Sequence, residues 1–317
     1  MDAKNIIMLS MVKGIGPVFI KRNIDRLLTD TSCRTLIQEN RPEEMQSIDN
    51  YSSEADAIIE ICKKEGIEII PITSSSYPKQ LLEINDPPSV LYLKGNKTLL
   101  NRIIAIIGTR HSTPLGNNIA ERLGSYFSTK FSICNGLVEG IDEHSIYSNG
   151  KVLSNVVGVI SGGLCYKETC TPRHIKIIDD VLSNEGLIIS EFPPKQKEDM
   201  YSGSKASRIQ AGLSDGLILV QSKINGGSKY TLSTFSKLNR TIGVILFPST
   251  NEYSSPEFDA NRLIVEKGVS GVAEMIGSKK TNNIRVKSII AIESRDDYKK
   301  IEISISNQEQ ESKNLFD

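Results

Sequence analysis

Short apolar runs without polar alternation recur through the middle of the chain. They cover residues 103–107, 131–134, 156–160, 187–190, 217–220 and 242–247. Strands that are apolar on both faces are typical of a parallel sheet covered by helices. Helical stretches lie between the runs, and two of them begin at Thr171-Pro172 and near Ser204. This alternation predicts an α/β protein with a doubly wound parallel sheet.

The segment around the first run carries the clearest chemical signal. The run ends at Gly108, and Thr113 and Pro114 then provide an N-cap and a first helical residue. The loop between them lies where open α/β sheets bind their ligands, and helix N–H groups together with Arg110 would attract a phosphate. The alternative is an ordinary turn that binds nothing, with the arginine in a salt bridge.

Other loops at predicted strand ends are also rich in glycine, serine and threonine. They cover residues 135–142, 161–163, 190–191 and 225–229. Because the carboxyl ends of parallel strands meet at one edge, we expect these loops to converge on one crevice. Several such loops together favour an anion site more strongly than any one of them alone.

The two ends of the chain differ from this middle part. Residues 1–70 are expected to form a helical domain. Within it, Val12-Lys-Gly-Ile-Gly-Pro17 resembles a helix-hairpin-helix turn. Such a turn either directs backbone N–H groups toward DNA or packs two helices against each other. Residues 71–278 form the predicted Rossmann-like domain. Residues 279–317 form a short extension with strands expected at 285–292 and 300–305 and a frayed tail from 306.

Composition excludes several classes of protein. The chain has 317 residues, zero formal net charge and five scattered cysteines, so reduced thiols in a cytoplasmic protein are expected. The apolar runs are too short for a membrane span, and G-x-G-x-x-G and P-loop motifs are absent. His111, His144 and His174 have no ligand-like spacing, and Cys165 and Cys170 lack a second pair, so no metal and no cofactor are expected. Ser161 and Ser190 lack evident His–Asp support, and no catalytic residue is assigned.

Five stretches of sequence together resemble the DNA-processing protein A family, also called Smf, over residues 70 to 270. They are residues 77–95, 106–116, 135–142, 207–214 and 261–268. The resemblance implies an extended Rossmann-like domain that binds single-stranded DNA, helps to load a recombinase and forms a homodimer. Asn135, Val138, Ala206 and Gln221 depart from the family pattern, Ile146 stands where the family has a histidine, and the tail does not fit a winged helix.

The predicted DNA- and phosphate-binding residues come from these loops and motifs. Arg110 and Arg208 are the expected phosphate contacts, and the alternative for each is an ion pair with Asp142 or Glu191. Lys205, Lys223 and Lys229 would widen a basic rim, and Tyr166, Tyr201 or Tyr230 would stack on bases. The remaining predicted site residues are Gly108, Thr109, Gly136, Gly140, Asp142, Gly162, Gly163, Gly226, Gly227 and Ser228.

The sequence therefore predicts a non-enzymatic protein that handles or protects single-stranded DNA, with a recombinase as a partner. The departures leave open a role in phage defence or as an antitoxin-like regulator of a partner toxin. A different alternative is a nucleotide sensor or N-glycosidase, for which Glu139 and Glu191 are the candidate carboxylates.

Overall fold

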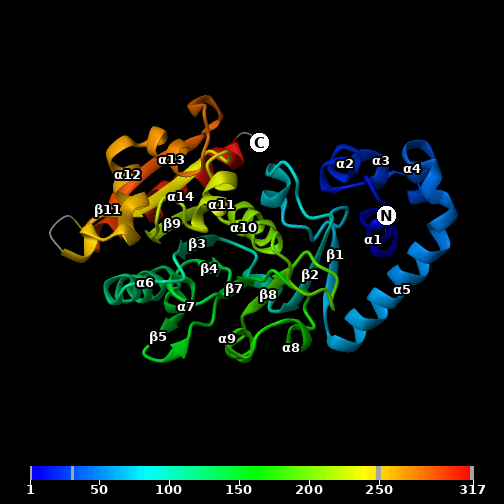
Figure 1. Ribbon diagram of the computed structural model, residues 1–317, viewed down its shortest axis with the longest axis horizontal. Coiled ribbons are helices and arrows are strands. Elements are labelled where there is room, and N and C mark those ends of the chain that lie inside the picture. Colours follow the sequence, from blue (N-terminus) through cyan, green and yellow to red (C-terminus); the bar gives the residue numbers. More distant parts are fainter. Residues whose placement is uncertain (1, 30–31, 248–250, 315–317) are drawn as a thin grey trace.

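A nine-stranded sheet with helices on both faces forms the centre of the molecule (Figure 1). The computed structural model describes residues 2–29, 32–247 and 251–314. Its strands are β1 (Glu68–Pro71), β2 (Val90–Gly95), β3 (Ile103–Gly108), β4 (Ser132–Asn135), β7 (Val156–Val159), β8 (Leu187–Ser190), β9 (Gly216–Gln221), β10 (Arg240–Ile245) and β11 (Val286–Ile292). A separate hairpin joins β5 (Tyr147–Ser148) to β6 (Lys151–Val152).

The sheet order is β1-β2-β8-β7-β4-β3-β9-β10-β11. All neighbours from β8 to β11 pair in parallel, whereas β2 is antiparallel to both β8 and β1. After β3 the chain builds the sheet toward β8, then returns and places β9 on the other side of β3. The doubly wound α/β fold is therefore confirmed, and the strand order reverses between β3 and β9.

The helices cover both faces and one edge of this sheet (Figure 1). They are α1 (Ala3–Met11), α2 (Pro17–Arg22), α3 (Ile24–Leu28), α4 (Cys33–Asn40), α5 (Ile48–Glu65), α6 (Pro114–Phe127), α7 (Ile141–Ile146), α8 (Tyr166–Thr169), α9 (Pro172–Ser183), α10 (Ser202–Leu213), α11 (Ser228–Phe235), α12 (Asp259–Lys267), α13 (Val269–Met275) and α14 (Asp296–Asn314). Short 3₁₀ segments cover Pro42–Ser47, Lys79–Glu83, Lys97–Leu99, Asn251–Ser254, Pro256–Phe258 and Thr281–Asn283. No helix in the described ranges is long and apolar enough to cross a membrane.

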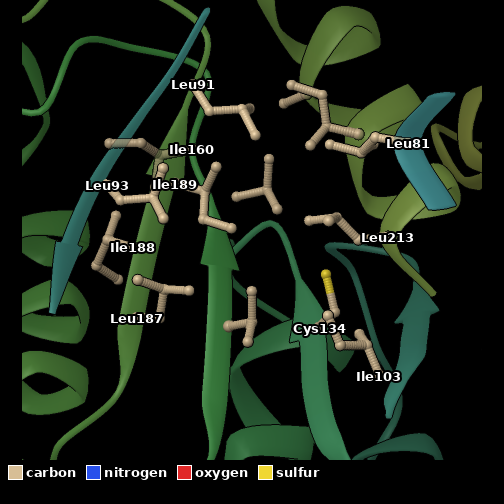
Figure 2. Packing of buried hydrophobic residues seen from close by; sticks show 14 of the residues in the cluster. Leu81, Leu91, Leu93, Ile103, Cys134, Ile160, Leu187, Ile188, Ile189 and Leu213 are labelled. Carbon is tan, nitrogen blue, oxygen red and sulfur yellow. The ribbon is translucent and has the colours of Figure 1, made fainter. Parts of the chain in front are cut away.

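The apolar runs of the sequence form the core as expected. Figure 2 shows Leu93 of β2 beside Ile189 of β8, with Leu213 of α10 facing the same interior; all three are buried. Burying a side chain of this size stabilises the fold by about 1.5–3 kcal/mol. This packing fixes the positions of the parallel strands, and therefore the positions at which the loops after them begin.

The N-terminal helices pack against the edge of the sheet at β1 (Figure 1). Buried Ile6, Ile7 and Leu9 of α1 belong to the same core cluster as the strands. The predicted helical region ends earlier than residue 70, because β1 begins at Glu68 and pairs with β2. This strand was missed because it is short and follows directly after the long helix α5.

The glycine turn at Val12–Pro17 joins α1 to α2 and packs within the protein. The Arg41 guanidinium lies over Gly14 and donates to its carbonyl oxygen at 3.5 Å, and Lys21 Nζ donates to the Ile84 carbonyl at 2.7 Å. These contacts favour the helix-packing interpretation of the turn.

The C-terminal part differs from the sequence expectation. The strand at 285–292 is confirmed, since β11 pairs in parallel with β10 and extends the sheet. The strand expected at 300–305 is wrong: these residues lie in α14, which also includes the described part of the tail predicted to fray. Residues 315–317 lie outside the described part. Tyr298, Ile301 and Ile305 are spaced as one helical face, and all three are buried, whereas Ile303 is 50% exposed.

Candidate functional site

A cavity of about 880 Å³ opens where the strand order reverses, at the carboxyl ends of β3 and β9. We call it the switch-point cavity. Its lining comes from Ile107–His111, Gly136, Val138, Asp142, Val159, Ser161, Met200, Tyr201, Gly203, Ser204, Ala206, Ser207, Gln210, Lys223, Gly226–Ser228, Tyr230 and Thr231. Most of the predicted loops thus converge, as the rule for open α/β sheets leads one to expect. The loop at Ser190-Glu191 does not line this cavity.

The loop after β3 is held in place by Gln221 at the end of β9. The Gln221 side chain accepts from the Thr113 backbone N–H at 3.0 Å and donates to the Thr113 hydroxyl at 3.1 Å, while its carbonyl accepts from Thr109 N–H at 2.7 Å. Thr113 also caps α6 by accepting from Gly116 N–H, which confirms the predicted N-cap. Gln221, a departure from the family pattern, therefore positions the loop that carries Arg110.

The loop from Asn135 to Asp142 is fixed by its own polar side chains. Asn135 is fully buried; its amide donates to the Asp142 carbonyl and to Ser145 Oγ, and its oxygen accepts from Leu137 N–H. Gly140 has a φ of 85°, and a Cβ there would lie 2.4 Å from the Thr109 carbonyl oxygen. Only glycine therefore allows this loop to approach the loop after β3 so closely.

The Asp142 carboxylate lies in the wall of the switch-point cavity and is 6% exposed. It accepts from Gly136 N–H at 2.9 Å. Burial raises the pKa of Asp142 to about 7, although the Gly136 N–H and the nearby positive charge of Arg110 act in the opposite direction. The alternative considered for Arg110, an ion pair with Asp142, does not form among the described residues.

Arg110 is exposed, lines the cavity, and forms no ion pair within the part of the chain that the structure describes. The cavity is also lined by Ser228, the first residue of α11, by its N-cap Gly227 and by the preceding Gly226. Ser228 Oγ is buried and has no hydrogen-bond partner among the described residues. The cavity lining thus includes an exposed guanidinium and a helix N-terminus whose Ser228 hydroxyl has no partner among the described residues, and this combination suits an anionic oxygen.

Aromatic and apolar side chains stand at the mouth of the cavity. Met200 is 85% exposed, Tyr201 is 64% exposed and Tyr230 is 49% exposed. Two of the predicted stacking tyrosines are therefore at the site. The third, Tyr166, is not, because it is buried and donates its hydroxyl to Asp179.

Arg208, which we expected to contact phosphate, lies outside the cavity lining. Its Nη1 and Nη2 each donate to a Glu191 carboxylate oxygen at 2.6 Å, and its Nε donates to Asp86 at 2.9 Å. Only 9% of its side chain is exposed. All three guanidinium nitrogens already have acceptors, so the structure places Arg208 in the alternative role, an ion pair with Glu191.

Several other predicted residues also lie away from the cavity lining. Lys205 lies over the Phe192 ring, and Lys229 lies over the Tyr230 ring. The Gly163 N–H donates to the Gln196 carbonyl oxygen, which also lies near Gly162. Lys223 lines the cavity but pairs with Glu257 at 2.7 Å. The carboxylates considered for a glycosidase are engaged as well: Glu139 pairs with Arg173, and Glu191 pairs with Arg208.

One side of the cavity is formed by residues that were not predicted from the sequence. Gly203, Ser207 and Gln210 of α10 line it together with Ser204. Their spacing of four and three residues places small and polar groups on one helical face, and this pattern was available in the sequence.

Residues 68–279 match the family described as DNA recombination-mediator protein A. The DNA processing protein DprA of Bacillus subtilis (strain 168) is 35% identical over 187 residues, which are 58% of this chain and 62% of that protein. DprA of Streptococcus pneumoniae (strain ATCC BAA-255 / R6) is 29% identical over 175 residues, 55% of this chain and 61% of that one. The matches thus span about three fifths of these relatives.

Solved structures show the same relationship. DNA processing protein A from Streptococcus pneumoniae superimposes with a TM-score of 0.72 at 21% identity, over 94% of this chain and 96% of that one, which shows the shared fold. A structure of DNA processing protein A from Helicobacter pylori, which concerns that protein's single-stranded DNA binding mode, has a TM-score of 0.54 at 25% identity and covers 64% of this chain and 88% of that one. The resemblance inferred from the sequence is confirmed, and the chain belongs to the DNA recombination-mediator protein A family.

Proposed function

We propose that this protein binds single-stranded DNA in the switch-point cavity and handles or protects those strands during recombination. In this proposal Arg110 and the start of α11 bind backbone phosphates, and Tyr201 and Tyr230 stack on bases. The Helicobacter pylori relative, whose structure concerns single-stranded DNA, supports this choice of ligand. A recombinase that receives the strand, and a second copy of the chain, are the partners that fit a recombination mediator.

The observation that carries the proposal is that the exposed Arg110 and the Ser228 hydroxyl, both without a partner among the described residues, line the same cavity. A buried hydroxyl without a partner costs about 1–3 kcal/mol, and a phosphate oxygen would satisfy it. The exposed rings at the mouth would otherwise be apolar surface facing water. Stacking contributes about 1–3 kcal/mol per base and tolerates any sequence, so binding without base-specific contacts is expected.

The choice of a single strand over a duplex also follows from this lining. A duplex keeps its bases stacked on each other and offers only phosphates and groove edges to a protein. A single strand offers phosphates and free base faces together, and the cavity presents a cation beside exposed rings. We therefore expect oligo(dT) to bind more tightly than a duplex of the same length.

The test is the affinity for oligo(dT), measured by fluorescence anisotropy. Arg110→Ala should weaken binding by about 1.5–3 kcal/mol, the range for a hydrogen bond to a charged group. Its salt dependence should also become shallower by about 0.7 in the log–log slope, because one phosphate contact is lost. The matched control is Arg34→Ala, which removes an exposed arginine from α4, far along the chain from the cavity residues. Equal affinities for the wild type and Arg110→Ala would remove this cavity as the DNA site.

A further inference from the structure

A second cluster of reactive side chains lies beside the switch-point cavity. One ligand-type atom from each of Cys170, His174 and Glu198 lies within 4.8 Å of the other two. Cys170 directly follows α8, and His174 is in the first turn of α9. Glu198 comes from the loop between β8 and α10, so that the cluster joins two segments separated in sequence.

The contacts of the described residues do not explain why the ring nitrogen Nε2 of His174 is buried. It is buried and has no hydrogen-bond partner among the described residues. A buried polar atom of this kind requires an explanation, such as an ion or a water that completes it.

The surrounding hydrogen bonds hold the other two side chains in place. Ser161 Oγ donates to the Glu198 carboxylate at 2.7 Å. Thr169 Oγ1 donates to the Gly163 carbonyl at 2.9 Å and lies 3.8 Å from Cys170 Sγ. Orientation of metal ligands by hydrogen bonds from neighbouring groups is a regular feature of metal sites.

We propose that Cys170, His174 and Glu198 form a binding site for one Zn²⁺ ion. A thiolate, an imidazole and a carboxylate are the ligand types that zinc takes, and three protein ligands leave one tetrahedral position for a water. Zinc–ligand bonds of about 2.0–2.3 Å place tetrahedral ligand atoms about 3.3–3.6 Å apart, so the side chains need to close by about 1 Å or less each. Cys170 binds as the thiolate, and its proton passes to the buffer.

The ion would join the start of α9 to the loop that precedes α10. That loop leads directly to Met200 and Tyr201 at the mouth of the switch-point cavity, and Ser161, the hydrogen-bond partner of Glu198, lines the cavity. Zinc therefore orders a rim of the proposed DNA site. Sequence spacing does not reveal this set, because neither the histidines nor the cysteines form a ligand-like pattern by themselves and Glu198 is 24 residues beyond His174.

The test is direct metal binding to the full chain, purified with reduced thiols and stripped of metal. Competition with a chromophoric chelator should show one tightly bound Zn²⁺ per chain. Co²⁺ should give a thiolate-to-metal charge-transfer band, and Mg²⁺ should not compete because it prefers oxygen ligands. Binding of less than one Zn²⁺ per chain at equimolar metal and micromolar protein would overturn the proposal.

Variants identify the ligands. Cys170→Ser and His174→Gln should each weaken zinc affinity by about 100-fold or more, since changes that merely touch surrounding groups already cost 10–100-fold. The controls are Cys165→Ser and His111→Gln, which should keep both the affinity and the cobalt band. Glu198 is exposed, so Glu198→Gln should fold normally and still bind more weakly. Unchanged zinc affinity in Glu198→Gln and His174→Gln, or loss of the band in Cys165→Ser alone, would contradict the assignment.

Discussion

At the scale of single residues, the central contrast lies between two arginines. Arg110 is exposed and unpaired among the described residues, whereas Arg208 is buried against Glu191 and Asp86. Burial opposes the charge of Arg208, but the two carboxylates outweigh it and raise its pKa. The two arginines should therefore respond differently to removal, one through DNA affinity and the other through stability.

Arg208→Ala should lower the free energy of unfolding by about 3–5 kcal/mol, because it leaves the Glu191 carboxylate, which is only 12% exposed, without its partner. Urea unfolding at neutral pH measures this, with Arg34→Ala as a control that removes an exposed ion pair and costs about 0–1 kcal/mol. The affinity of the folded fraction for oligo(dT) should stay unchanged. A stable Arg208→Ala protein with weakened DNA binding would instead return Arg208 to the role of a phosphate contact.

Asp142 should make the stability depend on pH. Its folded pKa of about 7 lies above its ordinary value of 3.8, so the folded protein binds more protons between these two values. Stability should fall as pH rises from about 4 to about 7 and then level off, by up to about 4 kcal/mol at about 1.4 kcal/mol per pKa unit. Asp142→Asn should remove this part of the pH dependence. Unfolding curves between pH 5 and pH 8 test this, and parallel pH profiles for the two proteins would refute it.

At the scale of elements, α14 provides the sharpest test of packing. In a strand, Ile301, Ile303 and Ile305 would share one face, whereas in the helix Ile303 points away from the buried Ile301 and Ile305. Ile301→Ala should cost about 2–5 kcal/mol of stability, and Ile303→Ala should stay within about 1 kcal/mol. Thermal unfolding of both variants checks this difference. Equal losses would favour the strand.

The elements of the sheet could be predicted from the sequence because their apolar runs were continuous and flanked by clear signals. The N-cap at Thr113 and the strand before Gly108 are examples. The helix at 296–314 could not be separated from a strand, since the alternating isoleucines also satisfy a helical spacing. The short strand β1 had no signal beyond two isoleucines and depends on its pairing with β2.

The site could be predicted only in part, for a physical reason. Strand order places Gly108, Arg110, Gly136 and Gly226 at one edge, and loop sequence alone gives this much. Whether an arginine is free or paired depends on side chains that are distant in sequence. Arg208 meets Asp86 through a contact across 122 residues, which no local pattern encodes.

At the scale of the whole molecule, the proposed DNA site lies at one edge of the sheet, at the carboxyl ends of β3 and β9. The N-terminal helices lie beside β1, at the other end of the strand order from β11 (Figure 1). Arg41 donates to the Gly14 carbonyl in the glycine turn, and Lys21 donates to the Ile84 carbonyl in the main domain. These contacts favour packing as the role of the N-terminal turn, and the proposed DNA site lies in the switch-point cavity.

Hydrogen–deuterium exchange with and without saturating oligo(dT) tests this central claim most directly. The account predicts slower exchange at residues 108–111, 200–207 and 223–231, which line the switch-point cavity, and unchanged exchange at residues 12–22 of the N-terminal turn. Protection confined to residues 12–22, with none at the cavity, would contradict the account.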